Sequence, residues 1–402
     1  MSMQVLENQS VDSVVVMSTI GWQDDYFMRT TNKEKFFEAV DDTDHNTRWI
    51  DNIRTNTLKV VQTDKREDIE YNAKVEENLY VGTGLTLQTE MGDYLISEVS
   101  RRSLYGSAKI EGSALGRISL DELVTILNTC FPMSNGRTLM LLRHDKIMAL
   151  HTGKYCIMPV SQLIRVTEEK LRDRFGRITF REGFHSNCFT RGIWTLDDKQ
   201  NDFMDQYYAS RKKNDAVPLR QEQNIIPALK FSASDTAQSR VVASPVIYCV
   251  ESGDCLPLVD GIAIKHVHRT GGLEGVAFYE ESLDQVWAKF DKGQEVIDKL
   301  IRTEIWNPVN CFVGLCNTVN GSATMIPRKY ADAARETIEM LAASESCLSA
   351  YDMYLAMGQC IRAAKKQGAA FQTIENIEES IARMLQLDWS KLDTGGVVAW
   401  RK

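Results

Sequence analysis

The 402-residue sequence predicts an α+β protein with a mixed or antiparallel central sheet, flanking helices and a C-terminal helical bundle. Three observations predict this class. Two segments with helical spacing lie between residues 86 and 130, strand-like runs dominate residues 137–268, and three helical segments follow residue 330. Apolar residues make up 43% of the chain and charged residues 25%, which is typical of globular proteins and excludes a disordered or collagen-like chain.

We divide the chain into three parts. Residues 1–75 are predicted to be an acidic, loosely structured leader, because the first hundred residues carry 19 acidic and 9 basic side chains with little hydrophobic periodicity. Within this leader, weak alternation over residues 57–61 indicates an edge strand. Residues 76–330 are predicted to form the α+β core, and residues 331–393 a helical bundle packed on that core.

Two helices are expected at the start of the core. The first spans residues 86–105, where apolar side chains recur at a spacing of four, namely Leu87, Met91, Leu95 and Val99. The second begins after Ser119, because Ser119 and Glu122 match a capping box ahead of an apolar run.

The middle of the chain changes to strand-like patterns. Residues 137–150 are typical of two strands around a tight turn at His144 and Asp145. A helix should follow Pro159 and end near Gly176. Further strands are expected over residues 177–180, 187–196, 228–233, 240–250 and 259–268. Helices are expected over residues 280–302, 330–341, 348–366 and 374–387.

No motif identifies an enzyme. The phosphate-binding loop G-x-x-x-x-G-K-[ST] and the nucleophile elbow G-x-S-x-G are absent. The nine cysteines have irregular spacing, which favours reduced thiols. The nearest approach to a zinc set, formed by Cys249, Cys255, His266 and His268, has a wider cysteine gap than zinc sites use. We therefore predict no catalytic residue, no cofactor and no metal.

One segment differs in charge from the rest of this acidic chain, whose net charge is −8. Between Arg137 and Arg191 there are 11 basic and 5 acidic side chains, and arginine predominates. Arginine binds phosphate through two parallel hydrogen bonds, and interleaved aromatic rings can stack on bases. The predicted nucleic-acid contacts are Arg143, Lys154, Arg165, Arg172, Arg174, Arg177, Arg181, Arg191 and Trp194. The alternative interpretation is a solvated helix and hairpin over an aromatic core.

Residues 137–156 combine an apolar strand ending in Arg143, a turn, a second strand and a short element with Tyr155 before a helix. This pattern resembles a family of phage- and plasmid-borne proteins catalogued as a domain of unknown function. Similar order and spacing extend over about residues 80–390, although residues 239–242 and 252–254 differ from the family's usual elements. The resemblance implies a phage, prophage or plasmid protein in a bacterial cytoplasm, and it supplies no catalytic residue.

These observations predict a nonenzymatic accessory protein of a mobile element that associates with nucleic acid, with a single strand as the expected partner. The alternative is a self-assembling or host-interaction phage protein whose arginines pair with the acidic leader. A second copy of the chain, in a homo-oligomer, is the other partner considered. An enzyme of unknown reaction is the third alternative. No run approaches 18 apolar residues, and the first residues lack the features of a secretory signal, so we expect a cytoplasmic protein without a membrane partner.

Overall fold

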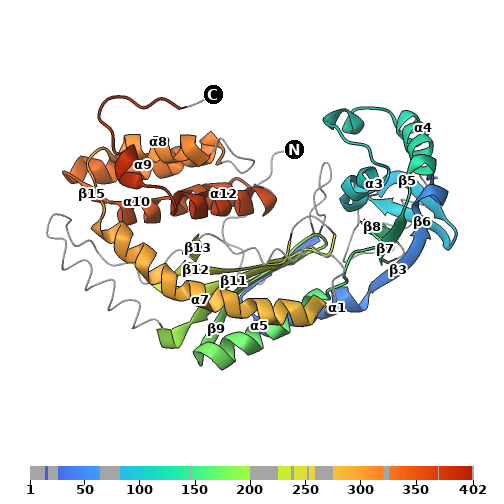
Figure 1. Cartoon of the computed structure of the whole chain (residues 1–402), viewed down its shortest axis with the longest axis horizontal. Coiled ribbons are helices and arrows are strands. Elements are labelled where there is room, and N and C mark those ends of the chain that lie inside the picture. The colour runs from blue at the N-terminus through green and yellow to red at the C-terminus, as the bar shows by residue number, and fades with distance from the viewer. Residues whose placement is uncertain are drawn as a thin grey trace.

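A computed structural model describes residues 14–16, 26–63, 82–144, 146–199, 225–236, 240–250, 253–258, 275–319, 326–369 and 371–400. Two large sheets organise the molecule (Figure 1). A seven-stranded sheet lies with the longest helices and the C-terminal helices, and a six-stranded sheet lies with α3 and α4 on the other side of the molecule. The predicted α+β class is confirmed, with antiparallel and mixed sheets and C-terminal helices that pack together.

The seven-stranded sheet is antiparallel at every junction. In spatial order its strands are β1 (Val14–Val16), β2 (Tyr26–Thr30), β9 (Ile178–Ser186), β10 (Thr190–Leu196), β11 (Ile225–Ala233), β12 (Val242–Cys249) and β13 (Asp254–Pro257). The strands predicted over residues 177–180, 187–196, 228–233 and 240–250 are thereby confirmed, whereas residues 259–268 lie outside the described part.

Three helices cover one face of this sheet, namely α1 (Lys33–His45), α5 (Val160–Phe175) and α7 (Gly275–Arg302). Side chains alternate between the faces of a strand, and Trp194, Leu229 and Phe231 point towards these helices, where they are fully buried. Helix α5 follows Pro159 and ends at Gly176, which has a φ of +73°. Glycine tolerates that left-handed conformation, so the predicted helix end is confirmed.

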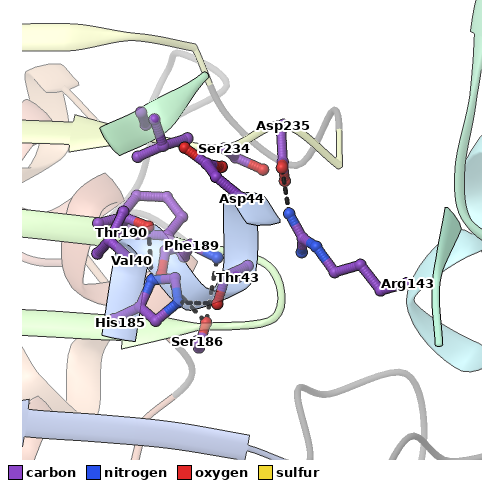
Figure 2. A pocket seen from close by; sticks show the side chains of 12 residues that line it. Val40, Thr43, Asp44, Arg143, His185, Ser186, Phe189, Thr190, Ser234 and Asp235 are labelled. Atoms are coloured by element: carbon purple, nitrogen blue, oxygen red, sulfur yellow. Dashed lines mark hydrogen bonds and ion pairs between the residues drawn. The ribbon is translucent and has the colours of Figure 1, made fainter. Parts of the chain in front are cut away.

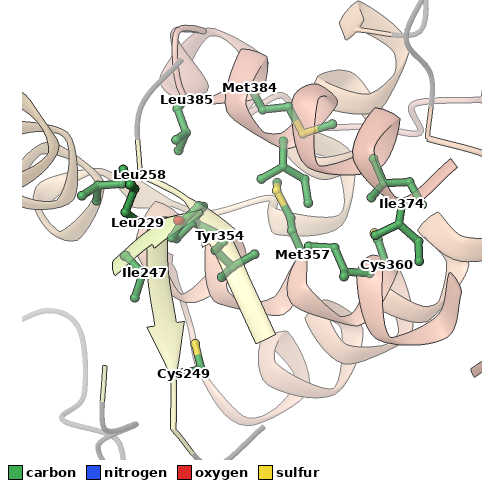
Figure 3. Packing of buried hydrophobic residues seen from close by; sticks show 14 of the residues in the cluster. Leu229, Ile247, Cys249, Leu258, Tyr354, Met357, Cys360, Ile374, Met384 and Leu385 are labelled. Carbon is green, nitrogen blue, oxygen red and sulfur yellow. The ribbon is translucent and has the colours of Figure 1, made fainter. Parts of the chain in front are cut away.

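The C-terminal helices are α8 (Pro308–Val319), α9 (Arg328–Ser344), α10 (Ala350–Ala356), α11 (Gly358–Lys366) and α12 (Phe371–Met384), with a small sheet of β14 (Glu304–Ile305) and β15 (Leu348–Ser349). Figure 3 shows Tyr354 beside Leu229 and Ile247 of the large sheet, with Met357 next to it and Cys360 farther away, beside Ile374. The Tyr354 hydroxyl donates to the Pro257 carbonyl at 2.7 Å, so this group is satisfied inside the core.

The six-stranded sheet is mixed, because β6 and β8 are parallel and the other pairs antiparallel. Its strands in spatial order are β3 (Thr47–Arg54), β7 (Arg137–Arg143), β8 (Lys146–Thr152), β6 (Gly92–Ser97), β5 (Gly82–Thr89) and β4 (Lys59–Gln62). The β7–β8 hairpin confirms the predicted strand pair and its tight turn, where His144 has a φ of +48°. The predicted edge strand over residues 57–61 is confirmed by β4.

The chain connection shows that this sheet curls. Strands β3 and β4 lie at opposite edges, yet only residues 55–58 separate them in sequence. A flat sheet of six strands would hold its edges about 24 Å apart, whereas five Cα steps span at most about 18 Å. The curled sheet encloses an apolar core with α3 (Arg101–Ser107) and α4 (Leu120–Cys130), and α4 begins with the predicted capping box of Ser119 and Glu122.

The helix predicted over residues 86–105 is wrong. The structure has β5, a tight turn and β6 there, and only residues 101–107 form the helix α3. A spacing of four is an even number, so it fits the alternation of strands as well as a helical turn. The β-branched Thr86 and Thr89, together with Gly92 at a φ of +138°, favour a hairpin.

The prediction of a loosely structured leader over residues 1–75 is wrong for residues 26–62. Strand β2 pairs with β9, β3 pairs with β7, and α1 packs on the seven-stranded sheet. Phe36, Val40 and Val60 are fully buried. The prediction relied on the high proportion of acidic residues in this region, and it overlooked short apolar patterns. A few buried side chains are enough to fix a helix or strand to the core. Residues 1–13, 17–25 and 64–75 lie outside the described part.

Candidate functional site

The predicted base-stacking residue Trp194 is fully buried. Its ring makes an edge contact with Phe180 at a centroid distance of 5.6 Å. Gly192 leaves room for the indole, since a Cβ at that position would lie 2.4 Å from it. Trp194 is therefore a core residue that presents no ring face to a base, and the predicted stacking role is wrong. Strand alternation placed it on the apolar face of β10.

Arg191, one residue of the predicted basic site, is buried in an ion-pair cluster with Lys230, Glu375 and Glu378. Its guanidinium lies 3.0 Å from Glu378 and 3.4 Å from Glu375. Lys230 reaches the same carboxylates at 2.5 and 3.1 Å. Burial alone would raise the pKa of Glu378, but the charges of Arg191 and Lys230 lower it to about 2. Burial raises the pKa of Glu375, which shares these cations. The cluster attaches α12 to the sheet, so Arg191 does not face solvent.

Arg143 is also buried, at the junction between the two sheets. Its guanidinium pairs with Asp235, donates to the Asn187 carbonyl at 2.8 Å, and donates to the Thr47 hydroxyl at 2.9 Å. The imidazole of His151 contacts the Asp235 carbonyl at 2.8 Å. Burial raises the pKa of Asp235 although Arg143 opposes this shift. Arg143 thus joins the six-stranded sheet to the seven-stranded sheet and is not a phosphate contact.

A small polar hollow lies at this junction (Figure 2). It is lined by Val40, Thr43, Asp44, Arg143, Val160, His185, Ser186, Phe189, Thr190, Ala233, Ser234 and Asp235. At its floor, the His185 ring contacts the Thr43 hydroxyl at 2.7 Å and the Thr190 hydroxyl at 2.9 Å. Thr43 donates its own proton to the Ala39 carbonyl, so its oxygen accepts from the Nε2–H of His185. Nδ1 of the ring then accepts from Thr190.

The polar groups of the hollow already serve the protein itself. Burial and the charge of Arg143 lower the pKa of His185 to about 3, so the ring is neutral at physiological pH. Asp44 accepts from the backbone N–H of Ser161 at 2.8 Å and so caps α5, whose own N-cap is Pro159. We interpret the hollow as the polar joint that holds α1, α5 and the two sheets together.

The remaining predicted contacts lie at or near the surface, and most of them are paired. Arg165 pairs with Asp41 of α1 and lies over the Phe37 ring. Arg172 pairs with Glu168, and Arg177 pairs with Asp198. Arg181 is largely covered: it donates to Thr195 at 2.9 Å and lies over the Tyr248 ring. Arg174 and Lys154 are exposed, without an ion pair to any residue that the structure describes.

Sequence reasoning missed the acidic partners of these arginines. Glu375 and Glu378 lie one helical turn apart within an apolar stretch that includes Ile374 and Ile377. The sequence did contain a signal for these partners, because the two carboxylates flank the apolar stripe of a helix. A carboxylate next to a buried stripe can itself be buried, and a buried charge requires a partner of opposite charge. Asp235 carried no such signal, since its partner Arg143 lies 92 residues away and only the fold brings them together.

Within the described residues, no three side chains of the metal-binding types gather in one place. Cys249 belongs to the apolar core on one face of the large sheet and Cys255 to a small cluster on the other face, so they do not converge. His266 and His268 lie outside the described part.

Comparisons with protein-family models, curated proteins and solved structures found no match for this chain. Among the helices that the structure describes, none is long and apolar enough to cross a membrane. Geometry and charge therefore carry the functional interpretation.

Proposed function

We propose that this protein is a nonenzymatic accessory protein of a phage, prophage or plasmid that binds single-stranded nucleic acid in the bacterial cytoplasm. The observation that carries this proposal is a cluster of exposed arginines, Arg172, Arg174 and Arg177, at the end of α5 and in the turn that follows. The side chains of Arg172 and Arg177 are 61% and 74% exposed. Exposed guanidinium groups bind the phosphates of a flexible strand through charge-assisted hydrogen bonds.

The carboxylate partners of this cluster do not prevent phosphate contact. Arg172 lies 2.6 Å from Glu168, and Arg177 lies 3.5 Å from Asp198. Ion pairs between exposed side chains contribute at most about 1 kcal/mol. Phosphate binding gains free energy from the release of condensed counterions, which a single carboxylate does not offer. A nucleic-acid strand can therefore compete for these arginines at low salt.

The mobile-element part of the proposal is supported by the resemblance of residues 137–156 to phage- and plasmid-borne proteins. The strands β7 and β8 and the helix α5 follow one another as that pattern requires.

A salt series tests the proposal. Fluorescence anisotropy of a labelled oligo(dT) of about 20 nucleotides should show binding at about 50 mM salt that weakens steeply as salt rises. Replacing Arg172, Arg174 and Arg177 by Gln should weaken binding and lower the salt slope by about 0.7 for each phosphate that the variant no longer neutralises. A control with equal charge change replaces Arg328, Arg383 and Lys391, which lie on other helices and turns of the surface. Equal affinity of the two triple variants would contradict the proposal.

A second candidate function is supported by the Arg165–Asp41 pair. This pair links the basic segment to α1, within the acidic region where a self-assembling or host-interaction protein was expected to hold its arginines. If the wild-type protein binds no oligonucleotide at low salt, we propose this function instead. Light scattering of the purified chain should then give the mass of a homo-oligomer or, for a host-interaction protein, that of a monomer.

A further inference from the structure

A second tryptophan has the environment that was expected for Trp194. Trp49 lies on β3, one of the two edge strands of the curled sheet, and its side chain is partly buried against the apolar cluster that contains Leu141 and Met148. Its ring stacks on Tyr155 with an interplanar angle of 26° and a centroid distance of 5.6 Å. Tyr155 in turn stacks on His151 at 3.8 Å. The indole is therefore held in place by two further rings, which lowers the entropy that a stacking interaction would cost.

Two exposed cations lie on the elements next to Trp49, namely Arg137 on the paired strand β7 and Lys154 beside Tyr155. Lys154 immediately precedes Tyr155, and its loop is fixed by a 2.7 Å hydrogen bond from the Gly153 amide to the Arg137 carbonyl. The Arg137 side chain is exposed and donates to the Asn52 carbonyl at 3.0 Å. Neither cation forms an ion pair with a residue of the described ranges. Asp51 is the exposed carboxylate nearest to Trp49 along the strand.

The exposed cations of this region suit an anionic partner. Residues 47–62 and 82–156 build the curled sheet and its helices, and they carry eleven basic side chains. Of these, Arg143 and Lys146 are buried, whereas Arg137 and Lys154 are exposed. A partly exposed aromatic ring beside exposed cations is the combination that single-strand binding uses, since rings stack on bases while cations contact the phosphates.

We propose that Trp49 is a stacking site for an unpaired nucleobase, with Lys154 and Arg137 contacting the flanking phosphates. This inference rests on the proposed function, because it assumes that the protein binds a single strand. It adds a specific contact at a place distant in sequence from the arginines of α5. The site takes any base, because every base offers a π face and none of these side chains reads a base edge.

The experiment follows tryptophan emission and anisotropy together while labelled oligo(dT) is added to the full chain. Binding should quench emission in the wild type, and Trp49→Phe should remove that quench while leaving the ring stack intact. Trp49→Ala should weaken binding about 5- to 150-fold. Lys154→Gln should lower the salt slope by about 0.7. Trp306→Phe is the matched control, because Trp306 is 59% exposed on a remote part of the molecule.

The outcomes separate this inference from the function on which it rests. If the wild type does not bind at low salt, both fail. If the wild type binds and only the triple variant of Arg172, Arg174 and Arg177 is weakened, the proposed function stands and the Trp49 site is refuted. Full quench and unchanged affinity in Trp49→Phe and Lys154→Gln would likewise overturn it. Loss of quench in Trp49→Phe but not in Trp306→Phe supports it.

Discussion

The two faces of the seven-stranded sheet hold their helices by different means. On β10, Trp194 points to an apolar face that packs against α1, α5 and α7, whereas Arg191 points to the opposite face and pairs with α12. Both side chains are almost completely buried. Apolar burial stabilises in proportion to the area removed from water. Buried ion pairs must first offset the cost of desolvation, so they stabilise only when every partner is present.

The two kinds of contact differ in how much displacement of a helix they tolerate. An apolar contact can shift slightly and retain most of its buried area, because it has no preferred direction. In the cluster of Arg191, Lys230, Glu375 and Glu378, two cations and two carboxylates must meet within hydrogen-bond distance. A displacement of α12 by one residue would separate them. We infer that the ionic face sets the position of α12 and the apolar face supplies most of the stability.

The largest expected effect is on the apolar face. Trp194→Ala should destabilise the protein by about 3–5 kcal/mol, because it removes a fully buried indole and leaves a cavity. Urea denaturation measures the loss. The exposed Trp306→Ala should change stability by less than about 0.5 kcal/mol. Equal stability of the two variants would show that Trp194 is not a core residue.

The ionic face should respond to the loss of one partner. Arg191→Met should cost about 3 kcal/mol, because Glu375 and Glu378 would then share Lys230 alone. The control on the same helix is Arg383→Gln, which breaks an exposed pair with Glu379 and should cost less than about 0.5 kcal/mol. Stability of Arg191→Met within about 1 kcal/mol of wild type would contradict the proposed coupling.

The joint between the sheets should make stability depend on pH through His185. The folded protein keeps His185 neutral down to its pKa of about 3, whereas the unfolded chain takes up a proton below its ordinary pKa of 6.5. The stabilising contribution is therefore complete above pH 6.5 and decreases as pH falls from 6.5 towards 3. About 2 kcal/mol should be lost by pH 5. Denaturation at pH 7 and pH 5 measures this loss.

His185→Gln should remove this pH dependence, and His45→Gln, an exposed change on α1, should retain it. Glu378 affects a different range, because its stabilising contribution is present above pH 4.5 and is lost as pH falls towards about 2. A wild-type stability that stays constant between pH 7 and pH 5 would be inconsistent with a buried neutral His185.

The smallest effect is expected in the curled sheet. Ser119→Ala removes the side-chain cap of α4 and should cost about 1 kcal/mol. Hydrogen exchange should accelerate at the start of α4, while β10 and β11 keep their protection. Faster exchange in β10 would indicate that the two sheets unfold as one unit.

Features with a short-range physical signal could be predicted from the sequence. The α4 start followed from Ser119 and Glu122, and the end of α5 from Gly176, because caps act within a few residues. The β7–β8 hairpin followed from two apolar runs around a tight turn. The helix prediction for residues 86–105 was wrong because a spacing of four fits both a helix and a strand. The turn residues that favour a hairpin lie outside that apolar pattern.

The candidate site depended on interactions that span the chain. The sequence showed that residues 137–191 are rich in arginine, but it held no information about which arginines face water. Arg143 meets Asp235, and Arg191 meets Glu378, across 92 and 187 residues. Trp194 and Arg191, three residues apart, were separated onto opposite faces by strand alternation. Helices from distant parts of the chain cover the two faces of the seven-stranded sheet. These helices determined that Trp194 packs against apolar side chains and that Arg191 pairs with carboxylates.

The sequence by itself therefore determined the α+β class, the positions of elements such as α4, β7, β8 and α5, and the local charge of the arginine-rich segment, because these depend on periodicity, caps and composition. Only the tertiary structure decided that Arg143 and Arg191 are internal ion-pair partners, that Trp194 is core, and that Trp49 lies partly exposed beside Tyr155. The physical reason is that burial and pairing are set by groups far away in sequence, whose positions follow from the packing of the whole chain.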